Sequence, residues 1–289
     1  MNTALIIFLT LLLEFVYDPI QKIRNYSIIK SLFTFYNKYA KEFIEENNII
    51  YFLFIFISVV IIIILNSFFE SSFHWTIFFI FNLLILLFCL KPNEFNQKID
   101  DFKLTLMNKI SIDDSLLKNL TPNLKIKKND KYFNTLILEN FFFNSSRNIF
   151  SVLFWFLLLG PAGAIGYRFL DYLAFTDEMR IDQKSRKEIL KLLGFFEYIP
   201  IRLTCIAFAV VGNFQYSINS WKNFISLSNM YESNINLINS IGMASLEFNK
   251  DSVEDNFIEK ITDVQTLISR SLLAWLSIIT LLILGGFFN

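Results

Sequence analysis

IIYFLFIFISVVIIIIL, residues 49–65, is the stretch that decides the fold class. It contains no charged side chain, and most of its residues each favour the bilayer by ~0.3–0.6 kcal/mol at the centre of a helix. Extended to residue 69, it is long enough to cross a hydrocarbon core, which takes about 20 apolar residues. A second apolar run follows at 73–90 after a short polar turn at 66–72. The two runs predict a transmembrane helical hairpin, and the charge and helix breaker of Lys91-Pro92 end it.

The composition of the whole chain agrees with this interpretation. Of its 289 residues, 54% are hydrophobic and only 18% are charged, whereas soluble domains carry about 25% charged residues. The formal net charge is +0, which gives no support for a nucleic-acid partner. The expected partner is the lipid bilayer.

Cysteine and histidine are too few for several common kinds of site. Cys89 and Cys205 both lie inside apolar segments without a CxxC partner, and His74 is the single histidine. We therefore expect no disulfide framework, no metal site and no cofactor.

The fold class expected from these patterns is all-α, a multi-pass transmembrane helical bundle in a single domain, 1–289, with four to six spans. The central segment at 149–175 contains Gly160-Pro161-Ala162-Gly163, which predicts a kink or a break and therefore either one kinked span or two half-helices. Its small residues would also let another helix approach closely. The apolar segments are expected at about 3–17, 49–69, 73–90, 149–175, 199–216 and 271–288, with a polar loop at 91–148.

The distribution of basic residues predicts the orientation. The segments at 17–48 and 91–148 are rich in Lys and Arg whereas 66–72 has none, so both flanks of the hairpin are expected in the cytoplasm. Residues 180–198 combine an apolar face with basic side chains, which predicts a cytoplasmic amphipathic helix that either lies on the inner leaflet or packs on the bundle. A further helix is expected to start at Pro200. The apolar N-terminal run is interpreted as a retained first helix.

Ionisable residues in or beside apolar segments are the candidate functional residues, because a charge in a bilayer is costly unless it is paired or functional. Arg168 and Asp171 are three residues apart and can pair on one helix face. Glu197 and Arg202 flank Pro200, where a helix is expected to start, and could face each other across the turn. The specific hypothesis is an anionic-ligand site at the cytoplasmic boundary, because arginine binds phosphate and carboxylate groups with two donors at once. The alternative is interfacial snorkelling and internal ion pairs. The ligand-site candidates are Arg147, Arg168, Arg202, Glu139, Asp171 and Glu197, and Glu14 is a further buried-charge candidate.

Two stretches carry a resemblance to a known family. The first is RNIFSVLFWFLLLGPAGAIGYR at 147–168, and the second is EYIPIRLTCIAFAVVGN at 197–213. Both resemble the AmpE type of inner-membrane protein. The resemblance implies a multi-pass protein of the bacterial inner membrane that modulates β-lactamase induction and the response to antibiotic, alongside the cytoplasmic amidase that recycles muropeptides.

The same resemblance extends to the adenosylcobinamide-phosphate synthases of cobalamin assembly, which supply an enzymatic alternative. Carboxylates of those synthases align with Arg147, Ala174, Leu193 and Gly194 here. Since amide synthesis needs acidic groups for metal or proton handling, we expect a regulatory protein with no catalytic residues. A small transporter is a further alternative, because interrupted helices often line substrate sites.

Overall fold

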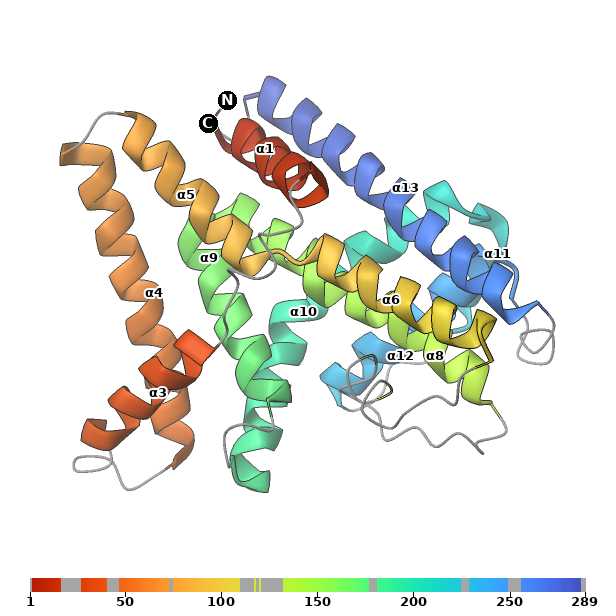
Figure 1. Ribbon diagram of the computed structural model, residues 1–289, viewed down its shortest axis with the longest axis horizontal. Coiled ribbons are helices and arrows are strands. Elements are labelled where there is room, and N and C mark those ends of the chain that lie inside the picture. The colour runs from red at the N-terminus through yellow and green to blue at the C-terminus, as the bar shows by residue number, and fades with distance from the viewer. Residues whose placement is uncertain are drawn as a thin grey trace. The chain divides into compact units, whose positions relative to one another are not determined.

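The computed structural model describes residues 2–16, 27–40, 47–72, 75–109, 117, 120, 132–176, 181–224, 229–248 and 256–286. Every secondary-structure element in these parts is a helix (Figure 1). The predicted all-α fold class is therefore confirmed. The chain divides into two compact units that interleave along the sequence: unit 1 contains 1–91, 151–196 and 286–289, and unit 2 contains 92–150 and 197–285. The single-domain boundary stays a prediction.

Five helical segments are long and apolar enough to cross a membrane, which lies within the predicted range of spans. They are Ile49–Ser71, Trp75–Met107, Phe133–Phe175, Gln183–Val211 and Phe257–Leu284. A shorter apolar helix, α1 (Asn2–Val16), packs against α5 in unit 1. The protein is thus a multi-pass membrane protein.

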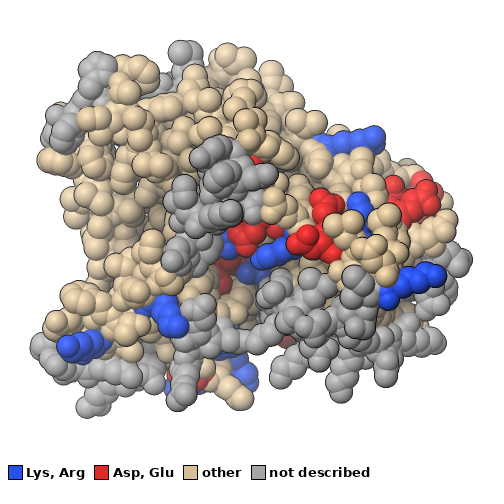
Figure 2. All heavy atoms as spheres, viewed as in Figure 1, with Lys and Arg blue, Asp and Glu red and all other residues tan. Residues whose placement is uncertain are grey.

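The predicted hairpin is formed by α4 (Asn47–Ser72) and α5 (Trp75–Cys89), which pack against each other in unit 1. The expected turn at 66–72 is wrong, because α4 continues through it. Asn66 accepts a 3.0 Å hydrogen bond from Asn82 Nδ2 on α5, so its polar side chain is satisfied within the hairpin. Figure 2 shows almost no charged atoms over these two helices, as lipid-facing surface requires.

The central helix α9 (Ser151–Phe175) lies against α4 and α5. Its predicted kink is confirmed at Gly160, where φ is 63° and ψ is −150°. Beyond the kink, a Cβ added to Gly166 would lie 2.8 Å from Val59 Cγ2 of α4. The absence of a side chain at this position is therefore what allows α9 and α4 to pack closely, as the run of small residues predicted.

Helix α10 (Gln183–Val211) runs without interruption through Pro200, so the prediction that a helix starts there is wrong. Proline lacks an N–H and leaves the carbonyl four residues earlier, that of Phe196, without its helical donor. The indole Nε1–H of Trp155 donates to the Phe196 carbonyl oxygen at 3.2 Å. A side chain of α9 thus replaces the missing backbone donor, which removes the reason for the helix to end at proline.

In unit 2, α6 (Pro92–Met107), α8 (Phe133–Ser145) and α13 (Phe257–Leu284) pack side by side. Phe102 makes edge contacts with the rings of both Phe141 and Phe257. The region expected as a polar loop at 91–148 therefore contains α6 and α8. Helix α6 combines Lys98 and Lys103 with a buried apolar face, whereas α8 has no Lys or Arg and buries most of its residues. Pro92 occupies the first position of α6, where its missing N–H costs nothing.

The remaining elements of unit 2 are α11 (Phe214–Lys222), α12 (Met230–Ser245) and the π-helix η1 (Ser146–Phe150), which continues α8. Helices α11 and α12 form an antiparallel pair that is joined by a hydrogen bond from the Asn213 amide to the Ser245 carbonyl, 2.8 Å long. Phe142 of α8 packs on Gly242 of α12. His74 lies outside the described residues.

Candidate functional site

Arg168 is the most completely buried of the predicted site residues in unit 1, with 1% of its surface exposed. Its Nη1 donates to Asp171 Oδ2 at 2.9 Å. Its Nε donates to the Cys89 carbonyl oxygen at 2.8 Å, and Nη2 donates to the same oxygen. The predicted pairing of Arg168 with Asp171 is confirmed, and a third group, a backbone carbonyl, joins the pair.

The position of that carbonyl explains why an arginine lies here. Cys89 is the last residue of α5, and the last carbonyls of a helix have no intrahelical donor. They also carry the negative end of the helix dipole, which a cation stabilises. Arg168 of α9 therefore caps the carboxyl end of α5, and Asp171 neutralises the guanidinium that does so. The guanidinium, the carboxylate and the backbone carbonyl, each of which would be costly to bury in a membrane protein without a partner, therefore satisfy one another.

Chemically, this cluster is an ion pair that holds α9 against the end of α5. It offers one carboxylate and one guanidinium, both already engaged in hydrogen bonds. Among the described residues, no group of three or more His, Cys, Asp and Glu side chains could hold a metal ion. An anionic ligand at Arg168 would compete directly with Asp171.

A second polar cluster lies in unit 2, around Arg147 of η1. Arg147 is 5% exposed, and its Nη1 donates to Asn144 Oδ1 at 3.2 Å. Its guanidinium carbon lies 5.6 Å from the centre of the Phe143 ring. Asn144 in turn donates to Asn140 Oδ1 and, at 2.9 Å, to the Leu120 carbonyl. Since π-helical turns occur frequently at functional sites, η1 marks this cluster as a candidate.

Arg202 occupies a third position, on the part of α10 that belongs to unit 2. Its guanidinium carbon lies 3.3 Å from the centre of the Tyr198 ring, and Nη1 donates to Asn234 Oδ1 at 3.1 Å. Glu197, on the same helix, is fully buried. Arg202 is therefore fixed by an aromatic face and an amide of α12, an arrangement that the hypothesis of Glu197 facing Arg202 did not include.

Among the predicted site residues, Arg168 and Asp171 are joined directly, and Arg147 and Arg202 each contact further polar partners. Glu139 is half-buried on α8, and Glu14 is buried on α1. The combined three-arginine ligand site stays a prediction. Sequence reasoning missed Asn140, Asn144 and Asn234, although the spacing of the first two, four apart in an apolar run, is the signal that could have identified them.

The family model described as "Regulatory signalling modulator protein AmpE" matches residues 6–288, nearly the whole chain. This chain belongs to the AmpE family. No curated protein and no solved structure matches it.

One hydrogen bond relates the two stretches that resemble AmpE proteins. Trp155 and Gly160 belong to the first stretch, and Pro200 belongs to the second. The hydrogen bond from Trp155 to the Phe196 carbonyl makes a tryptophan in the first stretch the compensation for a proline in the second.

Proposed function

We propose that this AmpE-family protein is a non-enzymatic regulator in the bacterial inner membrane that modulates β-lactamase induction and the response to antibiotic. The observation that carries the proposal is the match of the regulatory AmpE family model over residues 6–288. The protein would act alongside the cytoplasmic amidase that recycles muropeptides.

The chemistry at the aligned positions supports a regulator over a synthase. Arg147 occupies a position at which the related synthases carry a carboxylate, and here its cationic group is engaged with Asn144 and the Phe143 ring. A cation cannot accept a proton or bind a metal ion. The second aligned carboxylate is replaced by Ala174, which is buried and apolar.

A deletion strain with an inducible β-lactamase tests the proposal. We expect deletion to change the β-lactamase activity reached after exposure to a cell-wall antibiotic, and the wild-type chain supplied in trans to restore it. Arg147→Gln, Arg168→Gln and Arg202→Gln, each tested with the amount of membrane-inserted protein measured, separate two roles. A variant present at normal amounts that fails to restore induction identifies a residue of the signalling site, whereas loss of the protein itself identifies a structural residue.

Complementation tests the non-enzymatic part of the proposal. The chain is expressed in a bacterium that lacks adenosylcobinamide-phosphate synthase, and growth that depends on cobalamin made from adenosylcobyric acid is scored. We expect no growth while the protein is detected in the membrane. Growth would contradict the proposal, because it would mean that the missing carboxylates are dispensable.

A further inference from the structure

Arg202 of α10 is a half-buried cation whose contacts are all to neutral groups. They are the Tyr198 ring, the Tyr198 carbonyl oxygen at 2.8 Å and Asn234 Oδ1 at 3.1 Å. None of the ion pairs among the described residues includes Arg202. Arg168 differs in this respect, because Asp171 neutralises it. Since a charge on a membrane helix is costly without a counter-charge, Arg202 is a candidate site for an external anion.

The contacts of Arg202 leave one edge of its guanidinium available. Nη1 makes both hydrogen bonds, whereas Nε and Nη2 make none within the described part of the chain. Asn234 is fully buried on α12, so the guanidinium is held against the interior of unit 2. Two donors on one edge of a planar group match two oxygens of a phosphate or a carboxylate.

The side chain of Arg202 extends toward the amino-terminal part of α10. The Tyr198 carbonyl to which it donates lies about one helical turn earlier. The first turns of the same helix contain Lys184, Lys187 and Lys191, all exposed, and the positive-inside rule assigns such a basic end to the cytoplasm. Arginine side chains extend in this way to bring their charge to the membrane interface, where tyrosine is also enriched. The guanidinium is therefore expected at the level of the cytoplasmic headgroups.

An exposed apolar stripe follows Arg202 in the opposite direction along α10. Leu203, Ile206 and Val210 form it at helical spacing, and all three side chains are exposed. From Arg202 to Val210 the helix rises about 12 Å, which is most of one leaflet of a hydrocarbon core about 30 Å thick. A guanidinium edge at the interface with an apolar stripe below it matches a molecule with an anionic head and a hydrocarbon chain.

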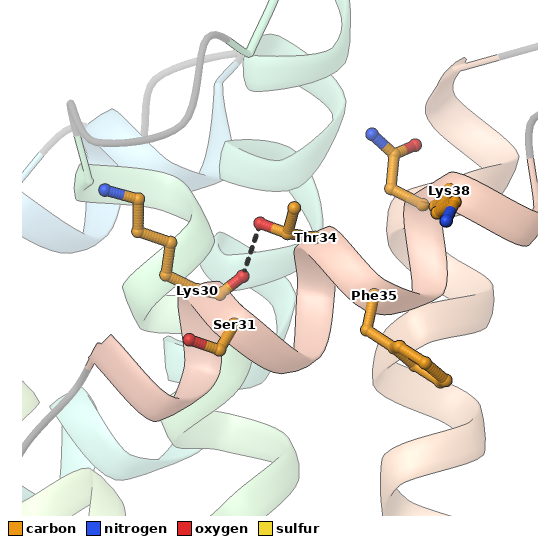
Figure 3. Close-up of a pocket in the computed structure, with 6 residues that line it drawn as sticks. Lys30, Ser31, Thr34, Phe35 and Lys38 are labelled. Carbon is orange, nitrogen blue, oxygen red and sulfur yellow. Dashed lines mark hydrogen bonds between the residues drawn. The ribbon is translucent and has the colours of Figure 1, made fainter.

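The lysines of helix α3 (Ser27–Ala40) in unit 1 lack this arrangement. Lys30 and Lys38 line a shallow pocket on α3, but they point away from each other (Figure 3). The Thr34 hydroxyl beside them donates to the Lys30 carbonyl at 2.7 Å and is thus used within the helix. The two lysine charges therefore do not converge on one anion, whereas Arg202 offers two donors from a single planar group.

We propose that Arg202 binds the phosphate of an anionic phospholipid whose acyl chain lies along Leu203, Ile206 and Val210. Purified full-length protein in detergent is titrated with phosphatidylglycerol and with phosphatidylcholine of identical acyl chains, and bound lipid is counted by native mass spectrometry. We expect phosphatidylglycerol to bind about fivefold more tightly, because one basic residue near a membrane surface contributes about 1 kcal/mol of attraction to anionic lipid.

Three variants locate the headgroup. Arg202→Gln should lower the ratio of phosphatidylglycerol affinity to phosphatidylcholine affinity about fivefold, because it removes the charge. Arg202→Lys should keep most of this ratio, because the charge remains. The matched control is Arg270→Gln, which removes an exposed arginine from α13 of the same unit and should leave the ratio unchanged.

A photoreactive lipid locates the acyl chain without any substitution. Phosphatidylglycerol with a diazirine in its acyl chain is irradiated together with the wild-type protein, and the labelled residues are identified by peptide mass spectrometry. We expect label on Leu203, Ile206 and Val210. Unlabelled phosphatidylglycerol should reduce this labelling at lower concentrations than phosphatidylcholine does.

Several results would overturn the proposal. An affinity ratio that Arg202→Gln leaves unchanged would place the headgroup elsewhere, and label confined to other helices would do the same for the acyl chain. Glycerol 3-phosphate that displaces the lipid at equal concentration would remove any role for the apolar stripe. A dimer without bound lipid that dissociates in Arg202→Gln would assign this face of α10 to a protein interface.

Discussion

Replacing Trp155 by phenylalanine removes one hydrogen-bond donor and keeps an aromatic ring against Phe196. The two rings lie 4.8 Å apart between centres, so most of their contact survives the substitution. What is lost is the donor for the Phe196 carbonyl, which Pro200 cannot supply. A fully buried carbonyl without a donor costs about 1–3 kcal/mol, and the Phe196 carbonyl is partly buried. Hydrogen bonds inside membrane proteins average about 0.6 kcal/mol, with a maximum of about 1.7 kcal/mol. We therefore expect Trp155→Phe to lower the free energy of unfolding by about 1–2 kcal/mol.

The cause is isolated by combining this change with Pro200→Ala. Alanine restores a backbone N–H at position 200, which can donate to the Phe196 carbonyl, so the carbonyl no longer depends on Trp155. In this background Trp155→Phe should cost less than about 0.5 kcal/mol, which gives a coupling of about 1 kcal/mol between the two positions.

Unfolding in mixed micelles of mild detergent and dodecyl sulfate, followed by circular dichroism, measures all four proteins of this cycle. Trp75→Phe, an equivalent substitution at an exposed position of α5, is the control and should stay within about 0.5 kcal/mol of the wild type. Equal costs of Trp155→Phe with proline and with alanine at position 200 would refute the reasoning, because the tryptophan would then be stabilising something other than the carbonyl.

Three further perturbations follow from the same structure. Gly160→Ala should destabilise the protein by about 1–3 kcal/mol in the same assay, because residue 160 has φ of +63° and ψ of −150°, a backbone conformation that only glycine readily adopts. A methyl group added there would meet no other atom, so the loss would come from backbone strain alone. Unchanged stability would mean that the kink is not needed. Arg168→Gln should cost about 3–5 kcal/mol, because it removes the cation that neutralises the buried Asp171 carboxylate. Adding Asp171→Asn should recover part of that loss, which a structural cost of Arg168 alone would not allow. Hydrogen bonds from the Ser185 hydroxyl and amide hold the pKa of the Asp182 carboxyl below its ordinary 3.8. Its contribution to the start of α10 is therefore complete above that value and is lost as pH falls through the lower folded-state pKa. The protection of the amides in that turn, measured relative to their intrinsic exchange rates, should fall through this transition in the wild type and be independent of it in Asp182→Asn.

Local spacing and hydropathy were sufficient to predict much of this fold. The apolar runs predicted α4 and α5, glycine and proline predicted the kink in α9, and the three-residue spacing of Arg168 and Asp171 predicted their ion pair. Each of these features depends on residues close together in the sequence. For that reason they need no knowledge of which helices pack together.

The incorrect predictions share a different cause, which is a partner far away along the chain. Asn66 resembled a turn residue because its acceptor role toward Asn82 on α5 leaves no local pattern. Pro200 resembled a helix start because the substitute donor is on Trp155. The Cys89 carbonyl was missed as a partner of Arg168 because a backbone acceptor is present at every position and therefore gives no signal.

The separation between Arg168 and Cys89 also sets an order of events during synthesis. The two residues are 79 positions apart, and unit 2 contributes the residues from 92 to 150 that lie between them in the chain. At about 5–20 residues per second, α5 is complete about 4–16 s before its capping arginine leaves the ribosome. The Arg168 contact that joins α9 to the end of α5 can therefore form only after the hairpin and the residues from 92 to 150 have been synthesised.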